Sequence, residues 1–139
     1  MPLPKWSDDY LLNQPEIDEE HRRLFELLGL LEAALYQDTD LVMPTVSEVI
    51  GVLNNHVEEH FQHEEALMRS LPAMTDRDRD DHKKDHERWK SRLKEYIPLL
   101  TNAKTDLERR AHLAKTLLVG KRFWEEHFLH FDRKLEKYF

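Results

Sequence analysis

The chain has 139 residues, of which 40% are hydrophobic and 35% are charged. This length and composition predict one folded domain, residues 1–139, with a substantial hydrophobic core. The net charge of −7, from 21 basic and 28 acidic residues, argues against nucleic acid or an anionic membrane as the main partner. There is no cysteine, which excludes a disulfide framework, a thiolate zinc site and an iron–sulfur cluster. Any metal must therefore be held by histidine and carboxylate side chains.

The sequence carries no targeting or membrane signal that we can identify. Its start has no apolar run of the kind that serves as a secretory signal. No uncharged stretch reaches the roughly 18 residues that a membrane span needs. We therefore expect a cytoplasmic protein without membrane insertion.

Residues 1–17 contain three of the six prolines and show no helical period, which predicts an extended N-terminal arm. Trp6 and Tyr10 are its expected anchors on the rest of the protein. Asp18 is a plausible N-cap for a first helix that runs to about Tyr36. The apolar positions of this helix step by three and four residues, and His21 lies on the same inward stripe.

A turn at residues 37–40 precedes a second helix, which begins between Asp40 and Thr45 and continues to about Ser70. His60 and Glu64 are four residues apart and so share one face of this helix, on its apolar stripe. Taken alone, such a pair is more often a satisfied core pair than a set of metal ligands. His56 lies one turn earlier and is interpreted as a hydrogen-bonded core or rim histidine rather than an extra ligand.

Thr75 or Asp76 opens a third helix, which Pro98 is expected to end. His82 and His86 lie on its inward stripe. A fourth helix opens at Thr105 or Asp106, and its inward stripe carries Gly120, Trp124 and His127. Gly120 indicates either room for a ligand path or a close helix crossing, and the sequence does not separate the two.

Four helices with short connections and no strand pattern predict an all-α fold: an up-down-up-down four-helix bundle over residues 18–139, with the arm outside it. Every inward stripe carries at least one histidine. Uncompensated burial of so many polar groups would cost several kcal/mol, which is difficult to explain by core packing alone. The inward set is His21, His60, Glu64, His82, His86, His127 and Asp132.

Seven ligands are too many for one tetrahedral zinc ion, and an imidazole-rich site without thiolates suits iron. Two octahedral ions offer twelve positions. If both carboxylates and one further oxygen bridge the ions, the seven side chains and that oxygen fill eleven positions. One position then stays open for a small ligand.

The same residues carry a resemblance to a known family. The motifs are Ile17-Asp18-x-x-His21-x-x-Leu24-Phe25, His60-Phe61-x-x-Glu64-Glu65-x-Leu67-Met68, His82-x-x-x-His86 and His127-x-x-x-x-Asp132. Together they resemble the hemerythrin family, specifically its single-domain bacterial members, over essentially the whole chain. The resemblance implies a non-haem di-iron centre with oxo or hydroxo and carboxylate bridges. It assigns His82, His86 and His127 to one iron and His21 and His60 to the other, with Glu64 and Asp132 as bridges.

By this resemblance we expect a monomer that binds O2 reversibly and is not an enzyme, for oxygen carriage, storage or delivery. The alternatives are a sensor of O2, nitric oxide or redox state that acts through a separate partner, and a di-iron enzyme that reduces peroxide or nitric oxide. The expected ligand pocket, over the two-histidine iron, comprises Trp124, Phe61, Trp89 and Phe128.

The sequence departs from the family pattern close to this pocket. Phe123 and Trp124 stand where Trp and Leu are usual, and Trp89 stands where Phe is usual. Trp124 is therefore expected either to narrow the route to the open position or only to pack between helices.

The spacing of the last two candidate ligands also predicts an irregular helix. Five residues on an ideal α-helix turn through about 500°, which leaves Asp132 roughly 140° from His127. Both side chains can reach one centre only if the helix widens between them, as in a π-type turn.

Overall fold

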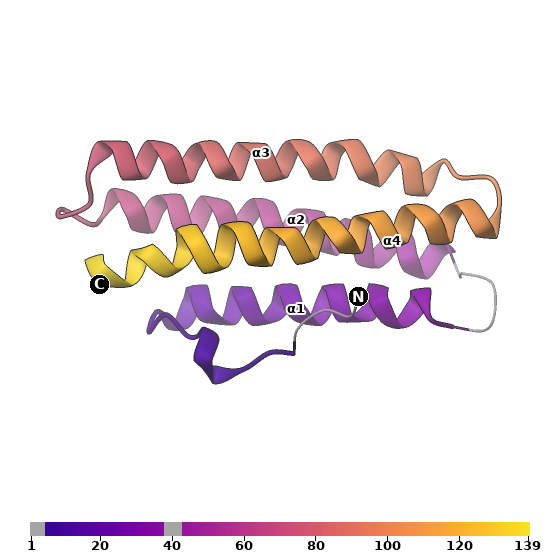
Figure 1. The fold of residues 1–139 in the computed structure, drawn as a ribbon, viewed down its shortest axis with the longest axis horizontal. Coiled ribbons are helices and arrows are strands. Elements are labelled where there is room, and N and C mark those ends of the chain that lie inside the picture. Colours follow the sequence, from indigo (N-terminus) through magenta and orange to yellow (C-terminus); the bar gives the residue numbers. More distant parts are fainter. Residues whose placement is uncertain (1–4, 38–42) are drawn as a thin grey trace.

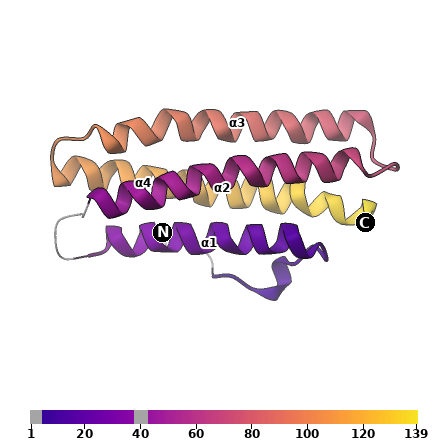
Figure 2. The same cartoon turned by 180° about the vertical axis from the view of Figure 1, so that it is seen from behind.

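The structure is a computed structural model that describes residues 5–37 and 43–139. Within these ranges it contains four long helices and no strand. They are α1 (Pro15–Leu35), α2 (Met43–Arg69), α3 (Asp76–Thr101) and α4 (Asp106–Arg122), and α4 continues into the π-helical segment η2 (Phe123–Asp132) and the short 3-10 helix η3 (Leu135–Tyr138). Figure 1 shows the four helices side by side, with the chain direction reversing from each to the next, and Figure 2 shows the same bundle from behind. The predicted all-α four-helix bundle is confirmed.

Each helix packs against two neighbours, α1 and α3 both against α2 and α4. The interior divides along the bundle axis. Apolar side chains such as Leu28, Leu31, Ile50 and Leu113 fill the half next to the α1–α2 and α3–α4 connections. Figure 1 shows the α2–α3 connection, the start of α1 and the C-terminus at one end of the bundle. The half next to that end holds the buried histidine and carboxylate side chains.

Two helices begin at the caps that the sequence indicates. The Thr75 side chain accepts a hydrogen bond from the backbone N–H of Asp78 at 3.1 Å, at the start of α3. Thr105 accepts one from the N–H of Glu108, also at 3.1 Å, at the start of α4. Each cap satisfies one of the N–H groups that the first turn of a helix leaves without a partner.

The start of α1 differs from the prediction. Its N-cap is Gln14 and its first residue is Pro15, so the interpretation of Asp18 as the N-cap is wrong and the arm ends before residue 17. A proline is favoured at this position because the first helical residue needs no N–H partner within the helix. Asp18 is instead buried and accepts the backbone N–H groups of Leu12, at 2.7 Å, and of Gln14, at 3.1 Å. It therefore ties the arm to the first turn of α1.

The end of α3 also differs. Pro98 does not end the helix, which continues to Thr101. A proline removes only its own N–H from the ladder, and its carbonyl here still accepts from the N–H of Asn102 at 2.9 Å. Leu100 is fully buried in the core, so packing holds the last turn in place.

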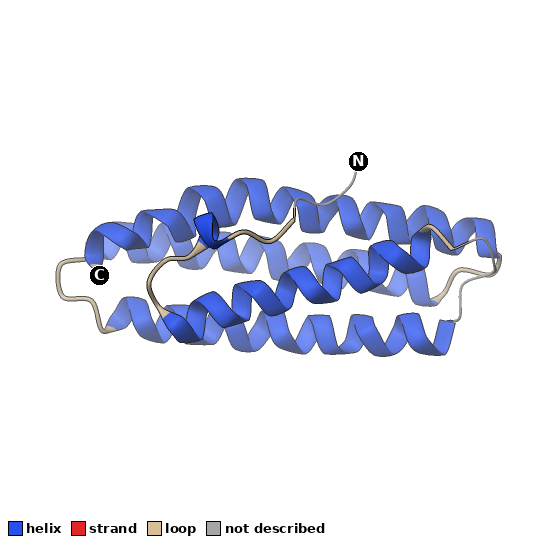
Figure 3. Cartoon of the chain, turned by 90° about the horizontal axis from the view of Figure 1, so that it is seen from below, coloured by secondary structure: helices blue, strands red, loops and turns tan. Residues whose placement is uncertain are grey.

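The arm lies outside the bundle on the side of α1 (Figure 3). It includes the 3-10 turn η1 (Asp8–Tyr10). The ring of Trp6 lies 5.6 Å from that of Phe25, and the ring of Tyr10 lies 4.9 Å from that of Trp124. The expected anchors of the arm are confirmed. Residues 1–4, and residues 38–40 of the predicted turn, lie outside the described part of the chain.

None of the described helices combines the length and the apolar character needed to cross a membrane.

Candidate metal centre

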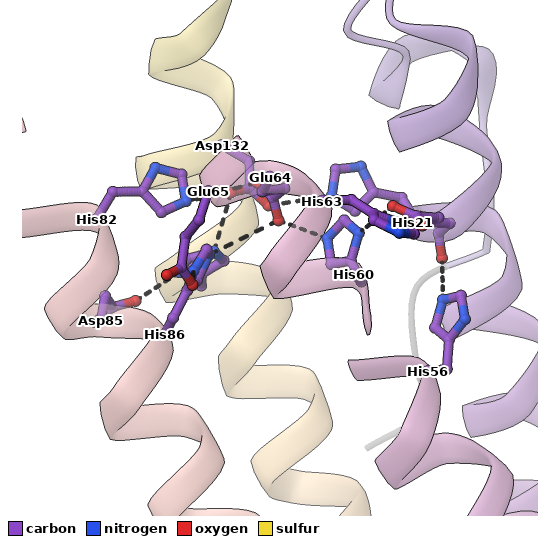
Figure 4. A network of polar contacts seen from close by, with 12 residues as sticks. His21, His56, His60, His63, Glu64, Glu65, His82, Asp85, His86 and Asp132 are labelled. Carbon is purple, nitrogen blue, oxygen red and sulfur yellow. Dashed lines mark hydrogen bonds and ion pairs between the residues drawn. The ribbon is translucent and has the colours of Figure 1, made fainter. Parts of the chain in front are cut away.

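Seven buried polar side chains meet between the four helices, in the half of the bundle next to the α2–α3 connection (Figure 4). None of them is more than 2% exposed. They are His21 from α1, His60 and Glu64 from α2, His82 and His86 from α3, and His127 and Asp132 from η2. The structure thus brings together all seven candidate ligands of the sequence.

The seven residues form two overlapping groups, each able to surround one ion. One group has three histidines, His82, His86 and His127, and the other has two, His21 and His60. Glu64 and Asp132 belong to both groups, and within each group one ligand atom of every residue lies within 4.8 Å of the others. Two carboxylates shared by two histidine groups are suited to hold a pair of neighbouring ions.

Asp132 reaches the two groups with different oxygens. Its Oδ1 lies 2.9 Å from Nε2 of His82 and 3.0 Å from Nε2 of His127, in the three-histidine group. Its Oδ2 lies 3.1 Å from Nε2 of His21, in the two-histidine group. One carboxylate therefore faces both candidate metal positions.

Glu64 likewise lies close to histidines of both groups. Its Oε1 lies 2.5 Å from Nε2 of His60 and 3.8 Å from Nε2 of His86, which belong to different groups. Its Oε2 lies 3.6 Å from Nε2 of His82. Glu64 and Asp132 thus both connect the two groups.

The π-helical segment η2 explains how His127 and Asp132 share one centre. The last helix is regular up to Arg122 and widens over Phe123–Asp132. The wider turn brings residues five apart onto nearly the same face, which a regular α-helix does not do. The predicted π-type turn between these residues is confirmed.

Most inward-facing atoms of the centre have no hydrogen-bond partner among the described residues, although they lie close together. They are Nε2 of His60, His82, His86 and His127, both side-chain oxygens of Glu64, and Oδ1 of Asp132. Each such buried atom costs free energy unless something else binds it. Imidazole nitrogens and carboxylate oxygens aimed at common points are what bound cations require, so the residues present fit a pair of metal ions.

The outer nitrogens of three candidate ligands are fixed by carboxylates of a neighbouring helix. Nδ1 of His60 donates to Glu20 at 3.0 Å, Nδ1 of His86 to Glu65 at 2.9 Å, and Nδ1 of His127 to Asp85 at 2.7 Å. A proton held on Nδ1 leaves the Nε2 lone pair free to face a metal, and such carboxylate partners fix the ring orientation. None of these three carboxylates was among the candidate site residues predicted from the sequence.

The chain matches the sequence model of the family described as the Hemerythrin HHE cation binding domain over residues 14–139. It belongs to the hemerythrin family. It is 34% identical over 98 residues to a bacteriohemerythrin of Stenotrophomonas maltophilia (strain R551-3), covering 69% of this chain and 59% of that protein. It is 33% identical over 91 residues to a bacteriohemerythrin of Pseudomonas paraeruginosa, covering 66% of this chain and 56% of that protein. The matched region therefore spans somewhat more than half the length of these curated relatives.

In this member of the hemerythrin family, the carboxylates hold protons on two of the candidate ligand histidines. Burial alone lowers the pKa of His60, but the carboxylates of Glu64 and Glu20 outweigh it and raise the pKa to about 10. Burial likewise opposes protonation of His82, whose pKa Asp132 and Glu64 raise to about 10. Burial raises the pKa of Asp132, yet the adjacent histidines hold it well below its usual range. A metal ion that binds through Nε2 of His60 or His82 must displace the proton from that nitrogen.

We expect metal binding at neutral pH to release at least two protons. His60 and His82, with pKa values of about 10, carry protons in the metal-free protein near pH 7 and must lose them to bind a cation through Nε2. Affinity should therefore rise with pH up to about 10. Titration calorimetry with Zn²⁺ in buffers of different ionisation enthalpy gives the number of protons released. Metal binding without proton release at pH 7 would contradict this assignment.

Two of the four expected pocket residues, Phe128 and Trp124, lie beside the two-histidine group, and Phe61 lies between the two groups. The Phe61 ring stacks on His86 of the three-histidine group at 4.0 Å between ring centroids and lies 6.0 Å from the His60 ring, whereas Phe128 meets the His21 ring edge-on at 4.7 Å. Trp124 lies 6.2 Å from His21, between ring centroids. It also stacks on Phe128 at 3.8 Å, so it both packs between elements and borders the two-histidine group.

Trp89, the fourth, lies on the other side of the centre. Its indole N–H donates to Asp85, which places it next to the three-histidine group rather than beside His21. His56 donates from Nε2 to the backbone carbonyl of Glu20 at 2.7 Å. The interpretation of His56 as a hydrogen-bonded rim histidine is confirmed.

Proposed function

We propose that this hemerythrin-family protein binds O2 reversibly at a non-haem di-iron centre and serves in oxygen carriage, storage or delivery. The observation that carries the proposal is the pair of overlapping ligand groups, one with three histidines and one with two, joined by Glu64 and Asp132. Histidine and carboxylate without thiolate suits iron, and the family description as a cation binding domain agrees with a metal site.

The two proposed iron positions differ in how many side chains surround them. His82, His86 and His127 would hold one iron, and His21 and His60 the other, with both carboxylates shared. The position with two histidines has fewer protein ligands, so we place the small-molecule ligand there. Iron supplies the electrons and the coordination position for O2, whereas the protein holds the ions in place and keeps bulk water out.

The surroundings of the two-histidine group support a small uncharged ligand rather than a polar one. Buried Phe128 and Trp124 form an aromatic wall beside His21, and partly buried Phe25 packs behind Trp124, with their ring centroids 4.2 Å apart. Such a wall excludes water and offers few partners for a charged substrate.

An apolar cavity of about 30 Å³ lies one to two helical turns from the candidate ligands, deeper in the bundle. Its lining includes Leu28, Trp89 and Gly120. This volume exceeds the roughly 10–15 Å³ that one water-sized molecule needs, so the space has room for a molecule as small as O2. A Cβ atom at Gly120 would come within 2.9 Å of the Leu28 side chain, so this glycine serves a close helix contact as well as lining the cavity.

The proposal predicts that O2 binding is stoichiometric and reversible. We expect the anaerobically iron-loaded protein to take up one O2 per iron pair, with a change in its visible spectrum. The original spectrum should return when the gas is replaced by argon. An anaerobic O2 titration with optical detection measures both steps.

Continuous O2 or peroxide consumption in the presence of a reductant would instead favour an enzyme. A sensor would bind a partner protein in only one oxidation state of the iron. An iron-loaded protein that shows no spectral response to O2 would overturn the proposal itself.

A further inference from the structure

One carboxylate near the metal centre has two buried hydrogen-bond donors on the same oxygen. Oδ2 of Asp85 accepts from Nδ1 of His127 at 2.7 Å and from the indole N–H of Trp89 at 2.9 Å. His127 is fully buried, Trp89 is 2% exposed and Asp85 is 7% exposed. The three residues form a short chain of contacts from the apolar core to a candidate ligand.

The second hydrogen-bond donor of Asp85 differs from that of Glu20, the carboxylate on α1 that also contacts a candidate ligand. Glu20 accepts from the candidate ligand His60, and its second donor is His63, whose side chain is 46% exposed. Trp89, by contrast, is locked in the core and cannot turn away without leaving a buried N–H without a partner. The hydrogen bond from Trp89 therefore restrains Asp85 more firmly.

A competing donor lies on the solvent side of Asp85. Nη1 of Arg88 lies 3.4 Å from Oδ1 of Asp85, and the same guanidinium also donates to Glu126 at 3.2 Å. Arg88 is half-exposed, so it can move with solvent and draw the carboxylate outward. If the indole N–H were absent, only His127 would hold Asp85 on its buried side.

We propose that Trp89 is a positioning residue for the metal centre. Its N–H fixes the Asp85 carboxylate so that Oδ2 keeps the proton on Nδ1 of His127, which leaves Nε2 of His127 free to face the metal. The effect of Trp89 on metal binding rests on the proposed function, because it requires an ion at the three-histidine position. The orientation of His127 would then set how tightly that ion is held. The hydrogen-bond geometry itself does not depend on the metal.

The test combines two substitutions singly and together: Trp89→Phe, Asp85→Asn and the double variant. Phenylalanine keeps an aromatic ring beside Phe123, which Trp89 contacts edge-on at 5.5 Å between ring centroids, and removes the N–H together with the smaller ring of the indole. The readout is the rate at which anaerobically bound Fe²⁺ passes to an excess of a coloured chelator. Trp6→Phe, the same change in the arm, is the matched control.

We expect Asp85→Asn to speed iron release about 10- to 100-fold, as is typical when a partner of a metal-bound histidine is lost. Trp89→Phe acts through that carboxylate and should speed release by a smaller factor, about 3- to 10-fold. In the double variant the Trp89 substitution should add nothing to the Asp85 effect. Trp6→Phe should leave the rate unchanged.

A second readout needs no metal. Nitrogen-detected NMR of the metal-free protein, recorded at a pH where the His127 ring is neutral, reports which ring nitrogen carries the proton, and Trp89→Phe should shift the balance away from Nδ1. Unchanged release and an unchanged tautomer, with only a lower melting temperature, would overturn the inference and leave Trp89 as a core residue. Additive effects in the double variant would also overturn it. Failure of the metal centre itself would appear separately, as no bound iron in the unmutated protein.

Discussion

Replacing Asp132 with alanine is expected to empty both metal positions at once. Its two oxygens face different ligand groups, Oδ1 toward His82 and His127 and Oδ2 toward His21. The substitution also leaves His82 and His127 without a carboxylate that raises their pKa in the metal-free protein. Loss of one member of a buried charged set costs about 3–5 kcal/mol of folding free energy. We therefore expect metal content and stability to fall together.

The matched comparison is His21→Ala, which removes a side chain from only one group. That variant should keep the ion of the three-histidine position and so bind about half the metal. Elemental analysis after reconstitution with Fe²⁺, together with urea unfolding of the metal-free forms, measures both effects. Full occupancy in the Asp132 variant, or equal losses in the two variants, would show that Asp132 is not shared between two ions.

The local part of this centre could be predicted because helix geometry alone determines it. His60 and Glu64, and likewise His82 and His86, are four residues apart, so each pair shares a face whatever the helix packs against. The presence of a polar residue on an apolar stripe then indicates that it points inward. Sequence reasoning therefore found the candidate ligands, whereas their mutual distances depend on the packing of the bundle.

The three outer carboxylates were missed because they act between helices. Glu20, Glu65 and Asp85 each stand directly beside a candidate ligand in the sequence, but each accepts from a histidine on the next helix along the chain. Which neighbouring helix they face depends on helix rotation and axial offset, which the periodicity of a single helix does not reveal. The available signal was the acidic residue directly beside His21, Glu64 and His86.

The boundary errors at Asp18 and Pro98 have a common cause. Both were assigned from local preferences, Asp for a cap and Pro for a helix end. In the structure, contacts outweigh these preferences. Asp18 is taken up by two backbone N–H groups of the arm and first turn, and buried Leu100 holds the turn that follows Pro98.

Changing the number of residues between His127 and Asp132 is also expected to have a large effect on iron binding, because the wide helical turn in η2 sets how these two side chains face each other. Asp132 faces the centre only because five residues of π-helix bring it near the face of His127. Inserting one alanine between Leu129 and His130, both exposed, would turn Asp132 by a further 80–100° or so and shift it along the axis. We expect this variant to lose nearly all bound iron while it remains helical.

Removing Leu129 instead tests the same geometry from the other side. It places the two positions four residues apart, and residues four apart on a regular α-helix also lie on one face. The deletion should therefore retain more iron than the insertion, although both change the chain length by one residue. Leu129→Ala keeps the spacing and serves as the control, with iron content and circular dichroism measured for all three. If the insertion variant bound two irons as the unmutated chain is proposed to do, Asp132 would not need the π-helical turn to reach the metals.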